Sequence, residues 1–143
     1  METDGLTLTH WRLITDTAAL VLIWLVQLVI YPAYTYQQRE DFGRWHPVYT
    51  RRVTYVVMPI MLGQVLVYAL LLWRGGVDWT VYLNTLLIAI VWAVTFFGAV
   101  PLHARLDDAT VEDHLPASRR LNRINAWRTG LWTVVWGVSV WFG

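Results

Sequence analysis

The stretch WTVYLNTLLIAIVWAVTFFGAVPL, residues 79–102, contains no Asp, Glu, Lys or Arg. It is long enough to cross the hydrocarbon core of a bilayer as a helix, which takes about 20 residues. Three more apolar stretches lie at residues 17–34, 53–73 and 124–142. All four are apolar around most of their circumference, so they lack the polar stripe of a soluble bundle. The sequence therefore predicts one domain, residues 1–143, that is all-α: an integral membrane antiparallel four-helix bundle.

The composition agrees with a membrane protein and excludes several functions. The chain is 57% hydrophobic and 15% charged, and it has 10 Trp and 7 Tyr, residues that favour membrane interfaces. It has no Cys, which excludes disulfides, thiolate metal sites and cysteine nucleophiles. All its basic residues other than histidine are arginine, so Schiff-base chemistry on lysine is excluded. A net charge of +1 offers no broad basic face, and we expect no nucleic-acid partner.

The arginines predict the orientation. With four spans, both termini lie on one side of the membrane and the long links, residues 35–52 and 103–123, lie on the other. Two arginines, Arg12 and Arg74, lie on the side of the termini. The side of the long links holds Arg39, Arg44, Arg51, Arg52, Arg105, Arg119, Arg120, Arg123 and Arg128. By the positive-inside rule we expect a multi-pass protein of a bacterial inner membrane, with cytoplasmic long links and external N- and C-termini.

Nearly all the unusual polar residues fall at the cytoplasmic ends of the predicted spans. Asn122, Asn125 and Thr129 recur at spacings of three and four, so they share one helix face. An antiparallel bundle brings the corresponding ends of all four spans to one level. The predicted pocket residues are His46, His103, Asn125, Arg128, Tyr31, Tyr49, Arg52, Asn122, Gln64 and Gln27.

Other polar residues have simpler expected roles. Gln27 and Gln64 lie at similar depth, and we expect them to hydrogen-bond one another between spans one and two. Asp16 follows Arg12 by four residues, which predicts an ion pair at the outer boundary. His114 lies in a long link, and we expect it at the surface.

Three of the five prolines fall within the predicted spans. Proline removes a backbone hydrogen bond and can kink a helix. Pro32 and Pro59 interrupt spans one and two, and Pro101 loosens the end of span three. We interpret these kinks as architectural. Pro47 suits the first turn of a helix, so span two is expected to begin inside the first long link.

Three interpretations of the cytoplasmic end remain open. His46 and His103 could ligate a metal ion or haem, although the carboxylates that might complete an iron site lie in a link. The cofactor is therefore unknown, and haem or a metal is not favoured. A polar-headed lipophilic ligand, such as a quinone, polyketide or fatty acyl group, could be held by Arg52, Arg105 or Arg128. Alternatively, these groups cap helices, pair with link carboxylates and contact lipid head groups.

The function predicted from these residues is binding of a small lipophilic molecule in the polar pocket, with redox or oxygenase-like chemistry as a candidate activity. Whether the protein is an enzyme stays open. The alternative is a non-catalytic small subunit or assembly factor of a larger membrane complex. The expected partners are the lipid bilayer, the lipophilic molecule, and further copies of the chain or a membrane partner.

Motifs along residues 20–135 carry a resemblance. In the first half they are Gln27-x-x-x-Tyr31-Pro32, Trp45-His46-x-x-Tyr49-Thr50 and Met58-Pro59-x-Met61-x-x-Gln64. In the second half they are Trp92-x-x-Thr95, Val100-Pro101-Leu102-His103 and Asn125-x-x-Arg128-Thr129. Together they resemble a family of uncharacterised bacterial four-span membrane proteins, which implies the fold and no activity.

The second half is also similar, more loosely, to the anthrone-oxygenase-like membrane proteins. Those proteins have a comparable proline-rich end to span three and an Asn-x-x-Arg-Thr-like start to span four, and they are linked to oxygenation of polycyclic aromatic polyketides. The resemblance implies site roles for His103, Asn125 and Arg128 only. The four-span bacterial protoporphyrinogen oxidases use a histidine in helix one and a lysine in helix three. Here the corresponding stretch of helix one has no histidine, and the chain has no lysine, so that identification is set aside.

Overall fold

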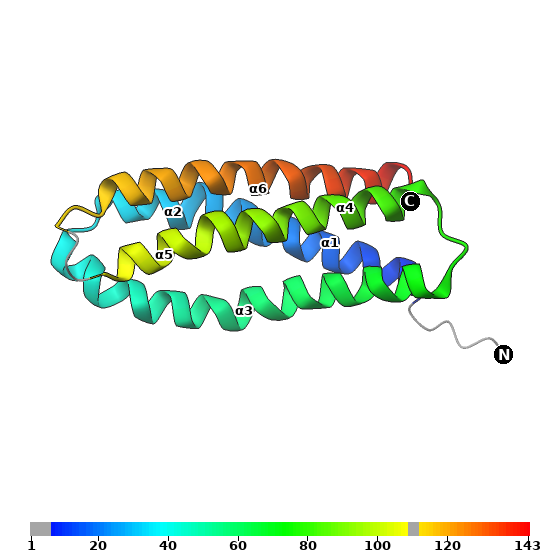
Figure 1. Ribbon diagram of the computed structural model, residues 1–143, viewed down its shortest axis with the longest axis horizontal. Helices are drawn as coiled ribbons and strands as arrows, with labels where there is room; N and C mark the ends of the chain where they lie inside the picture. The colour runs from blue at the N-terminus through cyan, green and yellow to red at the C-terminus, as the bar shows by residue number, and fades with distance from the viewer. Residues whose placement is uncertain (1–6, 109–111) are drawn as a thin grey trace.

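The computed structural model describes residues 7–108 and 112–143, and that part of the chain is helical with no strand (Figure 1). This confirms the all-α prediction. Within these residues the chain forms four long helices. Their segments in order are α1 (Leu8–Leu25), η1 (Val26–Ile30), α2 (Tyr31–Ala33) and η2 (Tyr34–Tyr36); α3 (Arg39–Arg74); α4 (Trp79–Val94), η3 (Thr95–Ala99) and α5 (Val100–Asp107); and α6 (Leu115–Trp141).

Three of the long helices have the length and composition to cross a membrane: Leu8–Tyr36, Arg39–Arg74 and Trp79–Asp107. The fourth, α6, has 27 residues but is not among them. It carries Asn125 and Arg128 in its middle, and both are buried inside the bundle. These two polar residues of α6 are thus turned inward, whereas Arg119, Arg120 and Arg123 near its start are exposed. The membrane crossing of α6 stays a prediction.

Three of the four long helices begin before the apolar stretches that predicted them, whereas α4 begins at Trp79 as predicted. The first helix starts at Leu8, before the predicted span 17–34, and α6 starts at Leu115, before 124–142. α3 starts at Arg39, before the apolar stretch 53–73 but inside the first long link as expected. Pro47 was expected in a first turn but lies inside α3. Hydropathy marks only the most apolar part of each helix, whereas backbone hydrogen bonding continues into the more polar ends.

The long helices lie along a common axis (Figure 1). Arg12 near the start of α1 donates from Nε to Ser139 Oγ near the end of α6, at 3.1 Å. These ends therefore lie together. Tyr31 of α2, His46 of α3 and His103 of α5 meet at the opposite end. We call this opposite end the histidine end.

Two π-helical segments each end just before a proline. η1 ends two residues before Pro32, and η3 ends two residues before Pro101. Proline has no N–H to donate, and the wider turn of a π segment is one way in which a helix accommodates the missing bond. The expected perturbations near these prolines are therefore present, and η1 and η3 both lead into the histidine end.

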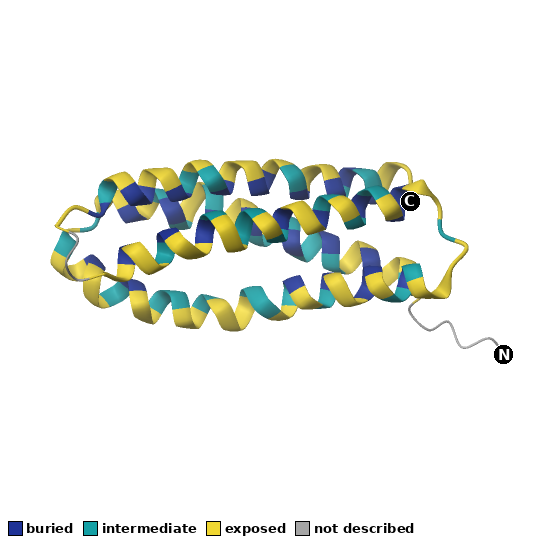
Figure 2. Ribbon diagram, in the orientation of Figure 1, coloured by how far each residue is buried: buried dark blue, intermediate teal, exposed yellow. Residues whose placement is uncertain are grey.

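The inward faces are buried and the outward faces are exposed (Figure 2). The buried polar residues form two groups, one at each end of the bundle. On each helix, buried apolar residues lie between them in the chain, among them Ile23, Met61, Val91, Trp132 and Val135. We call these five residues the apolar layer.

Asp78 begins α4 and supports one testable prediction. Its carboxylate accepts a hydrogen bond from the Thr80 backbone N–H at 2.8 Å, and it also bonds the Thr80 hydroxyl. Replacing Asp78 by alanine is expected to lower the free energy of unfolding by about 1 kcal/mol, because a helix N-cap is lost. The measurement is denaturant unfolding in detergent followed by circular dichroism.

The same cap predicts a pH dependence. The hydrogen bonds from Thr80 hold the pKa of the Asp78 carboxyl below its ordinary value of 3.8. The charged cap therefore stabilises the fold above that pH, and the stabilisation is lost as the pH falls through the lowered pKa. Asp78→Asn retains a capping oxygen and serves as the control. Equal stability of the alanine variant and the unchanged protein at pH 7 would contradict the assignment.

Candidate functional site

A cavity of about 250 Å³ lies between the helices near the histidine end. Its walls are mainly apolar, with Val57, Met58, Phe96 and Val100 among them. Polar side chains also line it. They are Tyr31, Tyr49, Thr50, Thr54, Thr95, His103 and Arg128, together with the indole of Trp92. The cavity thus joins an apolar chamber to a cluster of polar groups, as small-molecule sites commonly do.

Two N–H donors in the cavity lining have no hydrogen-bond partner among the described residues. They are Arg128 Nε and Trp92 Nε1, and both atoms are buried. Arg128 is only 5% exposed. A buried donor left unpaired costs about 1–3 kcal/mol, so two in one cavity need an explanation. Acceptor oxygens of a molecule bound in the cavity would provide one.

Asparagine and glutamine side chains hold Arg128 in place. Its Nη1 donates to Asn125 Oδ1 at 3.0 Å. Asn125 Nδ2 in turn donates to Gln27 Oε1 at 2.9 Å, and Gln27 Nε2 donates to Asn122 Oδ1 at 2.8 Å. The guanidinium carbon also lies 5.4 Å from the centre of the Trp132 ring. The shared face of Asn122 and Asn125 therefore positions the arginine.

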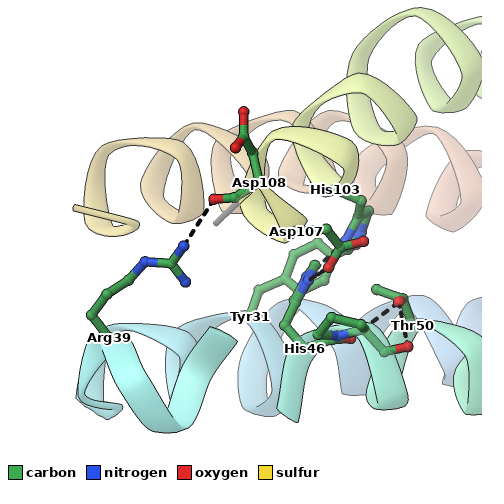
Figure 3. A network of polar contacts seen from close by, with 8 residues as sticks. Tyr31, Arg39, His46, Thr50, His103, Asp107 and Asp108 are labelled. Atoms are coloured by element: carbon green, nitrogen blue, oxygen red, sulfur yellow. Dashed lines mark hydrogen bonds and ion pairs between the residues drawn. The ribbon is translucent and has the colours of Figure 1, made fainter. Parts of the chain in front are cut away.

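A chain of hydrogen bonds leads from Tyr31 to Asp107, and Figure 3 shows its residues. Tyr31 Oη lies 3.0 Å from His103 Nε2. His103 Nδ1 lies 3.1 Å from His46 Nε2, and the two rings are stacked with their centres 5.2 Å apart. His46 Nδ1 lies 2.6 Å from Asp107 Oδ1.

The surroundings of His46 fix its ring. The side chain is fully buried, and Phe42 stacks on it with ring centres 4.9 Å apart. Tyr34 meets it edge-on at 5.4 Å. One turn along α3, Thr50 donates to the His46 carbonyl at 3.0 Å. Asp107 is different, because 38% of its side chain is exposed.

The structure brings together most of the predicted pocket residues. Tyr31, Tyr49, His103 and Arg128 line the cavity. His46 bonds to His103 behind the cavity wall, and Gln27, Asn122 and Asn125 support Arg128. Two predicted residues lie elsewhere. Arg52 is exposed and is not part of the lining, and Gln64 belongs to the other polar group.

The prediction that Gln27 and Gln64 hydrogen-bond to one another is wrong. Gln27 pairs with Asn122 and Asn125, whereas Gln64 donates to Asp16 Oδ1 at 2.7 Å and accepts from the Trp132 indole at 3.0 Å. Both glutamines bond to α6, but at different depths. Gln64 lies level with Asp16, which is 11 residues before Gln27 on the first helix.

The polar group at the other end is centred on Asp16. Its carboxylate accepts hydrogen bonds from Gln64 at 2.7 Å, Tyr68 at 2.7 Å and Ser139 at 2.6 Å. Arg12 donates to Tyr68 and Ser139. Arg12 and Asp16 are thus joined through two hydroxyls, in place of the predicted direct ion pair. We call this set, completed by Thr80 and Asn84, the Asp16 network.

The Asp16 network corrects a second expectation, that nearly all the unusual polar residues gather at one end. Asp16, Gln64 and Asn84 are all 0% exposed. Their apolar neighbours in sequence conceal them in a hydropathy profile. A carboxylate in the interior of a membrane-type helix is nevertheless a strong signal of a buried partner.

The sequence did not predict the roles of two residues at the histidine end, His114 and Asp107. His114 was expected at the surface, yet it is 4% exposed; its Nε2 lies 3.0 Å from the Tyr34 carbonyl oxygen and its ring stacks on Phe42. Asp107 was grouped with link carboxylates but ends α5 and contacts His46. Its spacing of four from His103 places both on one helix face, which could have revealed it.

A metal site finds little support in the geometry. Within residues 7–108 and 112–143, no group of three or more His, Asp or Glu side chains is placed to hold a metal ion. Both ring nitrogens of His46 and both of His103 have protein partners, and two of these nitrogens face each other. The two imidazoles therefore act as links in a hydrogen-bond chain.

Comparison of the chain with protein-family models, with curated proteins and with solved structures gives no match. The function must therefore be argued from the site itself.

Proposed function

We propose that this protein is an integral membrane protein that binds a small lipophilic molecule in the cavity. In this proposal all four long helices cross a bacterial inner membrane as an antiparallel bundle, with the histidine end cytoplasmic and the termini external. The membrane location is supported by three helices that are long and apolar enough to cross a bilayer. Large apolar side chains such as Leu28, Leu66 and Phe97 are 65%, 59% and 86% exposed, a surface suited to lipid.

The observation that carries the proposal is that two residues of a mainly apolar cavity lining, Arg128 and Trp92, each have a buried side-chain N–H donor without a partner among the described residues. They call for a ligand with acceptor oxygens on an apolar body, such as a quinone or a hydroxylated aromatic. The volume of about 250 Å³ is below the roughly 300–1,000 Å³ of common ligand pockets. It suits a compact ring system, and a longer tail would extend between the helices. Any redox or oxygenase-like chemistry would take place on a ligand held here.

The competing function is a small subunit or assembly factor that docks by its polar end. Such a subunit would present the histidine and asparagine face to its partner. In this fold His46 and Asn125 are both 0% exposed. Their burial supports an internal binding site over a docking surface.

The proposal is tested by purifying the protein in mild detergent and recording native mass spectra. We expect a retained small molecule that is released on denaturation. The second arm is calorimetric titration with a short-chain naphthoquinone and with the matching naphthalene, which lacks the carbonyl oxygens. The quinone is expected to bind at least about tenfold more tightly, the value of one hydrogen bond of about 1.4 kcal/mol. Absence of both a retained molecule and quinone binding would refute the proposal.

A further inference from the structure

We propose that Asp107, His46, His103 and Tyr31 form a proton path between the protein surface and the cavity, and that the ligand carries an acidic hydroxyl at its head. This inference rests on the proposed function, because the path ends at the ligand cavity. It specifies the class of ligand, a molecule with an acidic hydroxyl. It also gives the two histidines a role in proton transfer, which ligand binding alone would not require.

The path is continuous, and its two ends have different surroundings. Three contacts of 2.6, 3.1 and 3.0 Å join Asp107, His46, His103 and Tyr31 in that order. Asp107 is exposed over 38% of its side chain, so it can exchange protons with water. Tyr31 and His103 line the cavity at the other end. His46 connects the two and is fully buried.

One set of tautomers satisfies every contact. A charged Asp107 only accepts, so His46 donates from Nδ1 and accepts at Nε2. His103 then donates from Nδ1 to His46 and accepts at Nε2 from the Tyr31 hydroxyl. All three donors point the same way, toward Asp107. A chain with one direction is what stepwise proton transfer requires, since each group can give one proton as it receives another.

One proton leaves the ligand by successive transfers along the path. The ligand hydroxyl gives its proton to the Tyr31 oxygen, and the Tyr31 proton passes to His103 Nε2. The Nδ1 proton of His103 passes to His46 Nε2, and the Nδ1 proton of His46 passes to Asp107. Asp107 releases a proton to water. The net change is one proton from ligand to water, and the ligand anion stays beside the Arg128 guanidinium, whose Nε has no protein partner among the described residues.

Aromatic rings pack around His46, and several titratable or charged groups also face it. Phe42 stacks on one face of the His46 ring, and His103 stacks on it as the next member of the path. The titratable and charged groups that face it are Asp107 and His103 from α5, Tyr34 from η2, His114 at the start of α6, and Arg39 and Tyr49 from α3 itself. Arg39 Nη2 donates to the Asp108 carbonyl at 2.9 Å, beside the exposed end of the path (Figure 3).

The test uses a lipophilic 2-hydroxynaphthoquinone, whose neutral and anionic forms differ in visible absorption. The probe is bound to the purified full chain in detergent, and its protonation is followed after a pH jump by stopped flow. We expect His46→Phe, which keeps an aromatic ring in the stack, and Asp107→Asn to slow protonation about 100-fold. Asp107→Glu, which keeps a carboxylate, is expected to restore most of the rate.

The control is Asp41→Asn, an exposed carboxylate near the start of α3, which is expected to leave the rate unchanged. Equal rates in the unchanged protein, His46→Phe and Asp107→Asn, with the probe bound in all three, would overturn the proton path and leave the binding proposal intact. Failure of the probe, of the short-chain quinone and of native mass spectrometry to show any ligand would overturn both. Asp107 lies at the surface, so its variants keep the test valid if His46→Phe does not fold.

Discussion

Replacement of Asp16 by alanine is expected to lower the free energy of unfolding by about 3–5 kcal/mol, the largest stability effect of any single substitution proposed for this chain. The carboxylate accepts hydrogen bonds from Gln64, Tyr68 and Ser139, and it lies near the buried Arg12 guanidinium. Its loss removes the acceptor of three hydrogen bonds and a negative charge close to the buried Arg12 guanidinium.

The size of the loss in unfolding free energy distinguishes two roles of Asp16: hydrogen bonding alone, or hydrogen bonding together with charge compensation. Hydrogen bonds between membrane helices are worth about 0.6 kcal/mol each on average, so loss of three bonds alone would cost about 2 kcal/mol. A cost above about 3 kcal/mol requires the uncompensated charge as well. The measurement is denaturant unfolding in detergent, followed by near-ultraviolet circular dichroism of the tryptophans.

Two further variants complete the Asp16 experiment. Asp41→Ala removes an exposed carboxylate and is expected to cost no more than about 1 kcal/mol. Arg12→Leu combined with Asp16→Leu removes both charges and is expected to be less harmful than either single change, since a buried pair replaced by apolar residues is often tolerated. A cost below about 1 kcal/mol for Asp16→Ala would mean that the network is open to water and is structurally unimportant.

Replacement of Arg128 by leucine is expected to have the largest effect on binding. A hydrogen bond to a charged group contributes about 1.5–3 kcal/mol, so affinity for the short-chain naphthoquinone should fall about 10- to 150-fold. Trp92→Phe keeps an aromatic ring but loses the Nε1 donor, and is expected to weaken binding about fivefold. Isothermal titration calorimetry measures both.

The matched control is Arg105→Leu, the same change at an exposed arginine of α5. It should leave affinity unchanged. Melting temperatures of all three variants distinguish loss of binding from loss of the fold. If Arg128→Leu binds the quinone as tightly as Arg105→Leu does, the assignment of Arg128 Nε as a ligand donor is wrong.

The sequence predicts the helices far better than it predicts their contacts. A charge-free stretch such as residues 79–102 has few alternatives to a helix, and the Trp79–Asp107 helix contains it. The recurrence of Asn122 and Asn125 correctly predicts one inward face on α6, because that inference uses only the geometry of a single helix.

Partners on different helices depend on rotation and axial offset, which one sequence does not contain. Gln27 lies 95 residues before its partner Asn122, and neither segment contains a pattern that predicts the hydrogen bond between them. His114 is buried against Phe42, on which its ring stacks, and a count of charges in the link cannot show this contact. The unpaired N–H donors of Arg128 and Trp92 can be identified only when the hydrogen-bond partners in the folded chain are known.

The apolar layer of Ile23, Met61, Val91, Trp132 and Val135 has an electrical consequence. In the proposed topology it separates a proton path that opens to one side of the membrane from the Asp16 network toward the other side. A proton that enters at Asp107 would reach the ligand and stop there, because none of the five residues of the apolar layer beyond the cavity can take up a proton at ordinary pH. The bundle would therefore exchange protons with one compartment only, without dissipating the proton gradient of the membrane that holds it.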